Sequence, residues 1–139
     1  MSTPAPLTEY VWRSADFPLC TVGIPVEVLA ERWGMPLAHW EEPGLGHASG
    51  FGCKLASGLV VMLEEFAHVR EHQGALGPTL HVEAIELIER GIEGTLASVL
   101  SGLGLPHHSV TWLQTESGLQ AARQVVGAAR GRSGGTLRR

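Results

Sequence analysis

The sequence predicts an α+β domain with one mostly antiparallel sheet of about four strands and helices packed on it. Residues 51–66 and 79–85 alternate apolar and polar side chains as strands do, whereas residues 92–106 repeat apolar side chains at helical spacing. The expected order along the chain is helix, three strands, helix, strand and helix, and this mixed order is typical of the α+β class. The 139 residues, 44% of them apolar, suffice for one such domain with its own core.

The N-terminal third of the chain predicts one helix. Residues 1–10 contain two prolines and predict a loose or edge segment, and EYVWR (9–13) predicts a short strand. GIPVEVLAERWG (23–34) predicts a helix, because a proline suits its first turn, a glycine suits its end and apolar side chains share one face. The members of that face are Val28, Leu29 and Trp33. Residues 35–50 predict a loop, because prolines and glycines interrupt any period.

The clearest pattern is a β-hairpin over residues 51–66. Apolar residues alternate with small or polar ones from Phe51 to Leu55, and Ser57–Gly58 offers a tight turn. The strand after this turn is apolar on both faces over residues 59–63. We therefore expect it to lie in the centre of the sheet, covered on both sides.

The second half of the chain predicts two more strands and two helices. TLHVEAI (79–85) alternates again and predicts a third strand. The apolar stripe of residues 92–106 predicts a helix laid on the sheet. SVTWLQ (109–114) predicts a fourth strand that returns beside the others, and residues 117–130 predict a last helix.

Charge is unevenly distributed along the chain. All 14 acidic residues lie in the first 120 residues, against five of the ten basic ones, so this part carries a net charge of −9. Residues 121–139 hold five arginines and no acid. We predict a single domain over residues 1–130 and a flexible basic tail over residues 131–139. Because an acidic body repels phosphate and attracts basic surfaces, we expect a protein partner and no nucleic acid.

The sequence gives no indication of a membrane or a cofactor. No apolar run approaches the roughly 18 to 20 residues that cross a bilayer, and the N-terminal residues lack the pattern of a secretory signal. We therefore expect a cytoplasmic protein. Cys20 and Cys53 stand 33 positions apart without zinc-finger spacing, so neither a disulfide framework nor a structural zinc is predicted. Cys53 alternates inward with its apolar neighbours and is interpreted as a buried residue.

A group of histidines is the strongest candidate for chemistry. His68, His72 and His81 lie within fourteen positions of each other, and the first two would share one face of a helix. Three such ligands could hold a catalytic zinc, with Glu65 or Glu71 as general base. The segment between the second and third predicted strands is too short and too weakly apolar to predict a helix, however, and histidines near turns are mostly solvated or hydrogen-bonded to the backbone. A metal-dependent enzyme therefore stays as the alternative function.

One resemblance adds to this interpretation. The segments GFGCKLASGLVVMLEEF, PTLHVEA, IEGTLASVLSGLGLP and VTW lie between Gly50 and Trp112, about half of the chain. Their order of hairpin, strand, helix and strand resembles that of small bacterial immunity proteins, which neutralise polymorphic toxins by binding them. The resemblance implies an inhibitory binding protein without catalysis.

The first hypothesis is thus a protein that docks an acidic surface on a toxin or effector with a basic active site. Trp40 is the tryptophan most expected to be exposed, and its acidic neighbours make it a plausible interface anchor. A chaperone or adaptor with an exposed apolar groove is a further alternative. The predicted contact residues are Trp40, Glu41, Glu42, Glu64, Glu65 and Glu71.

Overall fold

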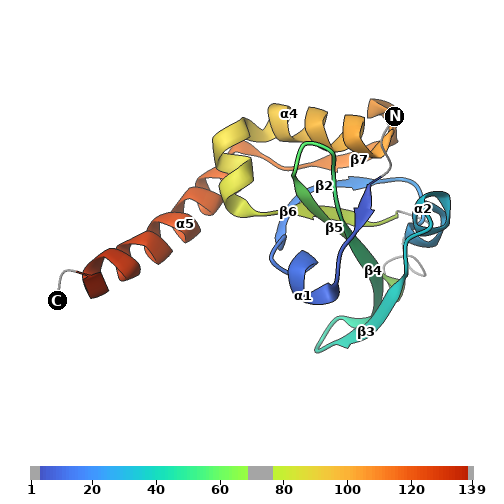
Figure 1. Ribbon diagram of the computed structural model, residues 1–139, viewed down its shortest axis with the longest axis horizontal. Coiled ribbons are helices and arrows are strands. Elements are labelled where there is room, and N and C mark those ends of the chain that lie inside the picture. The colour runs from blue at the N-terminus through green and yellow to red at the C-terminus, as the bar shows by residue number, and fades with distance from the viewer. Residues whose placement is uncertain (1–3, 69–76, 138–139) are drawn as a thin grey trace.

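The chain folds around one antiparallel sheet, as the computed structural model in Figure 1 shows. The model describes residues 4–68 and 77–137, except for the side chains of residue 10 and residues 129–137. The predicted α+β class is confirmed, but the described part of the sheet has seven strands instead of about four. The strands are β1 (Ala5–Pro6), β2 (Phe17–Val22), β3 (Ala38–Glu42), β4 (Gly46–Lys54), β5 (Val60–Phe66), β6 (Thr79–Val82) and β7 (Val110–Leu113). The helices are α1 (Glu9–Trp12), α2 (Val26–Trp33), α4 (Ala84–Leu103) and α5 (Glu116–Leu137), with a 3-10 turn at His107–Ser109.

The strands follow the order β1, β4, β5, β6, β2 and β7, and β3 pairs with the N-terminal half of β4, from Gly46 to Gly50. Every pairing is antiparallel. The predicted hairpin is confirmed as β4 and β5, and β5 lies between β4 and β6 as its apolar composition indicates. The predicted fourth strand is β7, which pairs with β2 at the end of the sheet.

The main core fills the space between one face of the sheet and the helices α2 and α4. Alternate residues of β5 separate the two faces of the sheet: Val61 and Leu63 belong to the main core, whereas Met62 belongs to a second, smaller cluster. Helix α1 covers that second face and contributes Trp12 to the smaller cluster, and Ala15 in the turn after the helix joins it. The sheet is therefore packed on both faces, with α1 in front of it in Figure 1 and α4 along its upper side.

Three predictions about the N-terminal half are wrong. Residues 9–12 form helix α1 and no strand, because the helix and the turn after it bring Trp12 and Ala15, three positions apart, onto the sheet together. Residues 35–50 form β3 and the start of β4 and no loop, because glycines with positive φ at 44 and 46 allow a tight reversal between two paired strands. In α2 the buried side chains are Val26, Leu29 and Ala30, whereas Val28 is 44% exposed.

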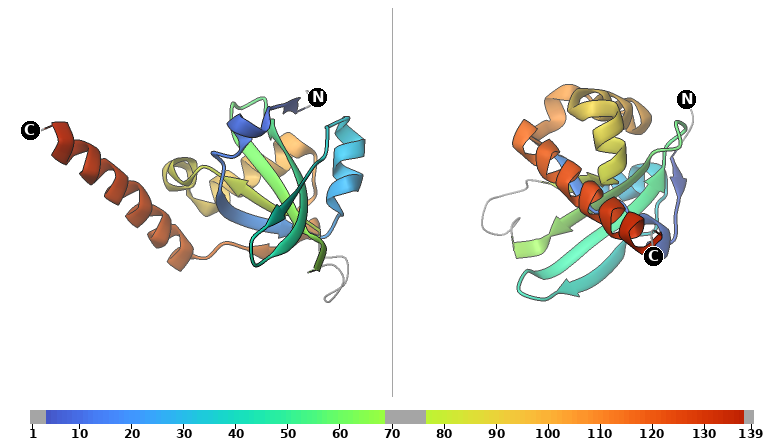
Figure 2. Two further views of the ribbon diagram at one scale, coloured as in Figure 1. Left: turned by 90° about the horizontal axis from the view of Figure 1, so that it is seen from below. Right: turned by 90° about the vertical axis from the view of Figure 1, so that its left-hand side faces the viewer.

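The last two helices are longer than predicted. Helix α4 starts at Ala84, where the predicted third strand was expected to continue, and it passes through a break at Gly91. It ends as expected, because Gly104 takes the left-handed conformation with φ 66°. Helix α5 continues to Leu137, into the segment for which we predicted a flexible tail. Figure 2 shows that α5 leaves the body of the molecule after its first turns, where Leu119 and Ala122 are buried. No helix within the described ranges is long and apolar enough to cross a membrane.

Candidate functional site

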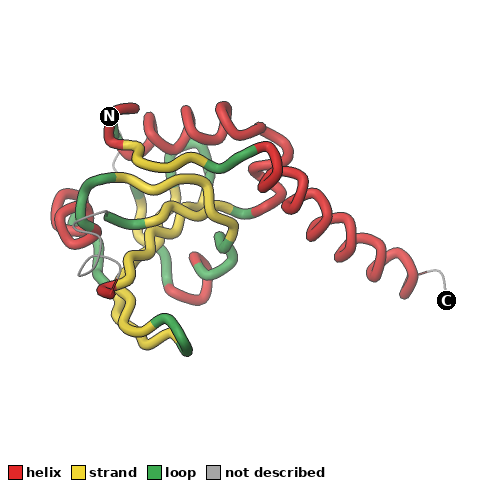
Figure 3. The backbone as a smooth tube through the Cα atoms, turned by 180° about the vertical axis from the view of Figure 1, so that it is seen from behind, coloured by secondary structure: helices red, strands yellow, loops and turns green. Residues whose placement is uncertain are grey.

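The hairpin of β3 and β4 projects beyond the body of the molecule. Figure 3 shows it at the lower end, away from α4 and α5. Five residue pairs, from Ala38 opposite Gly50 to Glu42 opposite Gly46, hold the two strands in register. At the turn, the amide of Leu45 donates to the carbonyl of Glu42 at 2.9 Å, and the Leu45 side chain is 49% exposed. The hairpin thus presents an apolar side chain at a fixed tip.

One face of the hairpin carries a ladder of polar side chains. Nδ1 of His47 lies 3.2 Å from a carboxylate oxygen of Glu41, and Nδ1 of His39 lies 2.9 Å from the hydroxyl of Ser49. The two imidazole rings stack with centroids 5.5 Å apart and an interplanar angle of 16°. These contacts are solvent-exposed, and the side chain of Glu41 remains 76% exposed. The ladder fixes the side chains of the strands without withdrawing the acidic group from water.

The opposite face of the hairpin leads into a cluster of two tryptophans and an arginine. The rings of Trp12 and Trp40 lie 5.9 Å apart between centroids. The guanidinium carbon of Arg13 lies 4.5 Å from the Trp40 ring centroid and 5.0 Å from that of Trp12, within the range of cation–π attraction. Nη2 of Arg13 also lies 3.6 Å from a carboxylate oxygen of Glu9, one turn earlier in the chain.

Two glycines of β4 make room for this cluster. A side chain at Gly52 would collide with the Cβ and indole ring of Trp12. A side chain at Gly50 would collide with the carbonyl of Leu63 and press on the ring of Trp40. Gly50 and Gly52 lie on the same face of the strand, so they form a flat backbone floor under the two indoles.

Acidic groups border the tryptophan cluster. Glu64 lies opposite Gly50 in the register, and its carboxylate is 3.9 Å from Nε2 of His81. Burial raises the pKa of Glu64 above its usual value, the charge of Glu42 raises it further, and Arg13 lowers it. Burial lowers the pKa of His81, against the opposing influence of the Thr79 and Met62 backbone and of Asp16. Glu64 is thus held close to a ring that burial keeps neutral.

The predicted contact residues occupy different environments. Glu41 is exposed, and Glu42, Glu64 and Trp40 are half-buried on or beside the hairpin. Trp40 is therefore not the most exposed tryptophan, because Arg13 covers its ring, and Trp112 on β7 is 42% exposed instead.

Glu65 has a structural position. It is only 8% exposed, and its carboxylate accepts a hydrogen bond of 3.2 Å from the amide of Val26 at the start of α2. Glu71 lies outside the described residues. Of the acidic contact set, Glu41, Glu42 and Glu64 are thus the described members available for a partner.

Two of the three predicted metal ligands, His68 and His81, lie among the described residues. His81 lies on β6 beside Glu64, and the exposed His68 packs edge-on against Phe66 with centroids 6.2 Å apart. His72 lies outside the described residues, so the three-histidine site stays a prediction. Within the described ranges, no group of three or more histidine, cysteine, aspartate or glutamate residues could hold a metal ion. Cys20 and Cys53 are fully buried, as expected for Cys53.

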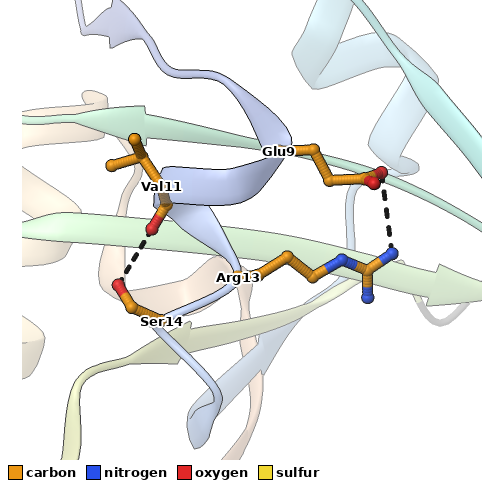
Figure 4. A pocket seen from close by; sticks show the side chains of 4 residues that line it. All are labelled: Glu9, Val11, Arg13 and Ser14. Carbon is orange, nitrogen blue, oxygen red and sulfur yellow. Dashed lines mark hydrogen bonds and ion pairs between the residues drawn. The ribbon is translucent and has the colours of Figure 1, made fainter.

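A shallow depression lies on the outer side of α1. It is lined by Glu9, Val11, Arg13 and Ser14, and Figure 4 shows Glu9 and Arg13 extending toward each other on one side of the helix. Val11 is 41% exposed, and its carbonyl accepts a hydrogen bond of 2.9 Å from the hydroxyl of Ser14. The depression gives access to the Arg13 guanidinium from solvent.

Sequence reasoning did not identify Arg13, Trp12 or Leu45 as site residues. One signal could have found the first two. Glycines at alternate positions 50 and 52 of a strand indicate that another group approaches its backbone closely. Leu45 carries no such signal, because its role depends on the turn that exposes it.

No protein-family model, curated protein or solved structure matches this chain. The functional interpretation therefore rests on the geometry and charge of the residues described above.

Proposed function

We propose that this protein is a non-catalytic binding protein that docks an acidic surface on a basic protein, in the manner of immunity proteins that neutralise toxins. The surface is the β3–β4 hairpin together with the neighbouring Glu64 and Trp40. The observation that carries the proposal is the projecting hairpin, which presents the exposed Leu45 at its tip and the exposed Glu41 on its flank. An apolar contact with a charged margin is the usual composition of a protein interface.

The rigidity of the hairpin supports this role. Its five paired residues and the His39–His47 stack hold the tip in one conformation before any partner binds. A preformed surface loses little conformational entropy on association, so more of the contact energy appears as affinity.

The charge of the molecule supports the same partner. The first 120 residues carry a net charge of −9, and Glu41 and Glu42 lie on the projecting hairpin. Acidic groups on an exposed edge attract a basic surface during the encounter and repel acidic ones. A toxin or effector with a basic active site is the class of partner that fits this surface.

The decisive experiment measures binding to a partner captured with the intact protein from among the proteins encoded beside it. Isothermal titration then compares the wild type with Glu41→Lys/Glu42→Lys and with Leu45→Asp. Each variant is expected to weaken binding about tenfold or more, because charge repulsion or a buried carboxylate replaces a favourable contact.

The matched control is Glu89→Lys/Glu93→Lys, which makes the same change of net charge at two exposed positions of α4. We expect this pair to lower the affinity only slightly, because it weakens the long-range attraction without changing a contact. Equal losses of affinity in the hairpin pair and the α4 pair would show that only net charge matters and would refute the hairpin as the docking surface.

A further inference from the structure

The cluster around Arg13 has the composition of a binding site for a cationic side chain. Two indole faces and nearby carboxylates are the groups that attract a guanidinium or an ammonium in proteins. In this molecule Trp12 and Trp40 supply the faces, and Arg13 supplies the cation from within the same chain. The cation stands at the border of the site, because the side chain of Arg13 is 39% exposed.

Arg13 is held there by few contacts. Its ion pair with Glu9 is long, 3.6 Å, and joins two exposed side chains one helical turn apart. Exposed pairs of this type contribute little, because water screens the charges. The rest of its attachment is the cation–π contact, which any other guanidinium could make equally well.

The negative charge around the site exceeds the positive charge. Glu9, Glu42 and Glu64 act on the same region as Arg13, and the ring of His81 beside Glu64 is kept neutral by burial. Three carboxylates thus surround one arginine, whose ion pair with Glu9 is long. The carboxylates of the site can therefore attract another cation in addition to Arg13.

One further observation points to an external group. Nδ1 of His81 is buried and has no hydrogen-bond partner among the described residues, and an imidazole nitrogen without a proton accepts a hydrogen bond from a cationic group. The indole N–H of Trp40 is also buried without a partner, but it only donates and therefore does not bind a cation. His81 is only 9% exposed, and its other ring nitrogen, Nε2, lies 3.9 Å from the Glu64 carboxylate. Buried polar atoms in folded proteins usually have partners. The depression on α1 reaches Glu9 and Arg13 at the border of the site.

We propose that the Trp12–Trp40 pair with Glu42 and Glu64 binds an arginine or lysine side chain of the protein partner, and that Arg13 occupies this site in the free protein as an internal competitor. This inference rests on the proposed function and names the group of the partner that the acidic surface recognises. Removing Arg13 should then strengthen the binding of an external cation, because the site is vacated and a like charge is removed.

The test uses the full chain and a short arginine-rich peptide, with binding followed by tryptophan fluorescence and by NMR. The variant Arg13→Ala is expected to bind this peptide about tenfold more tightly than the wild type. An arginine of the peptide can then make the cation–π contact with the indoles, and the repulsion from the positive charge of Arg13 is removed. Replacing Trp40 by Leu in the Arg13→Ala background should remove the gain. A peptide with citrulline in place of arginine has nearly the same shape without the charge and should not bind.

Arg90→Ala is the matched control, because Arg90 pairs with Glu86 one turn earlier on α4 as Arg13 pairs with Glu9 on α1. Both variants lose one arginine and one exposed ion pair. Equal peptide affinities of the two variants would overturn the proposal. Arg13→Gln keeps much of the side-chain stem over the indoles and repeats the test if Arg13→Ala does not fold.

The outcome separates this inference from the proposed function. If the Arg13 variants gain no affinity for the peptide while the hairpin variants lose the partner, the cation site is refuted and the docking surface stands. If the Arg13 variants gain affinity but the hairpin variants bind the partner normally, the cation site stands and the hairpin is refuted.

Discussion

At the scale of single residues, the carboxylates of this protein have different roles that the sequence does not distinguish. Glu64 and Glu65 are neighbours on β5, but strand alternation sends them to opposite faces of the sheet. Glu65 points toward the start of α2, where the N-cap residue Pro25 makes no side-chain cap. The sequence predicted both as partner contacts, because a pair of acids beside an apolar strand indicates exposure until the register of the sheet is known.

Replacing Glu65 by Ala should destabilise the protein by about 1 to 2 kcal/mol. The first amide of α2 then loses the carboxylate that accepts its hydrogen bond, and this hydrogen bond lies in the interior of the protein. Urea unfolding followed by circular dichroism measures this change. The exposed Glu41→Ala is the control and should change the unfolding free energy by less than about 0.5 kcal/mol. Equal effects of the two substitutions would contradict a capping role for Glu65.

The buried His81 should make the protein less stable in mild acid. Its pKa is lowered in the folded state, so between its usual value of 6.5 and the lower folded value the unfolded chain binds a proton that the folded chain does not. Stability therefore falls as the pH decreases below 6.5. His81→Gln should reduce this fall, as measured by thermal unfolding across that range. An unchanged pH dependence in the variant would assign the loss to other groups.

Glu64 should change the pH dependence of stability in the direction opposite to His81. Its pKa is raised in the folded state, so its contribution is fully present below the usual value of 4.5 and is lost as the pH rises through the folded value. Glu64→Gln should therefore be more stable than the wild type at neutral pH, with the gain disappearing below pH 4.5. A variant that is less stable at neutral pH would show that contacts with Arg13 and His81 outweigh the cost of burying the charge.

At the scale of elements, the sequence predicted those whose hydrophobic pattern is undisturbed. The hairpin of β4 and β5, helix α2 and strand β7 were predicted as elements at their places in the chain, although the buried face of α2 was not. The missed strands have other causes. Proline at position 18 and a shift of register after it interrupt the alternation of β2, and β3 is a short edge strand whose acidic residues are typical of loops. Trp12 and Arg13 were missed as site residues for a related reason, since helix α1 and its C-cap lie where a strand was predicted.

Helix α4 contains a backbone conformation that only glycine adopts readily. Gly91 has φ 76° and ψ 168°, and its carbonyl accepts a hydrogen bond of 2.7 Å from the hydroxyl of the buried Thr95. Because α4 changes direction there, residues 84–90 can follow β6 directly while the following turns lie on the core. This break explains why the apolar stripe predicted only the second part of the helix.

Gly91→Ala should destabilise the protein by about 1 to 3 kcal/mol, because an L side chain is strained in this region. Gly94→Ala is the matched control in the same helix, with ordinary helical geometry and only an ordinary contact to Arg90. It should be neutral or stabilising by up to about 1 kcal/mol. Chemical denaturation of the two variants side by side measures the difference, and similar values would refute the strain at Gly91.

At the scale of the whole molecule, one sheet joins two packed layers. The main core lies between the sheet and the helices α2 and α4, and the smaller cluster under α1 supports the projecting hairpin from the other face. The tryptophan site therefore lies on the face of the sheet opposite the main core, and Gly50 and Gly52 of β4 form the backbone surface beneath both indoles. A binding surface supported in this way should keep its geometry as long as the sheet remains folded.

The two cysteines provide a test of whether the sheet unfolds as one cooperative unit. Cys20 on β2 and Cys53 on β4 are both fully buried in the main core, and burial raises the pKa of each thiol to about 12. Since only a thiolate reacts readily, neither should be modified by a thiol reagent in the folded protein. If the sheet opens only as a whole, both thiols should become reactive at one common rate, and this rate should rise with urea as global unfolding does. Mass spectrometry of the labelled peptides distinguishes the two sites, and the chain unfolded in guanidinium gives their full intrinsic reactivity. Faster labelling of Cys53 than of Cys20 would mean that β4 opens separately from the rest of the sheet. The part of β4 under the two tryptophans would then unfold locally and would not belong to one cooperative sheet.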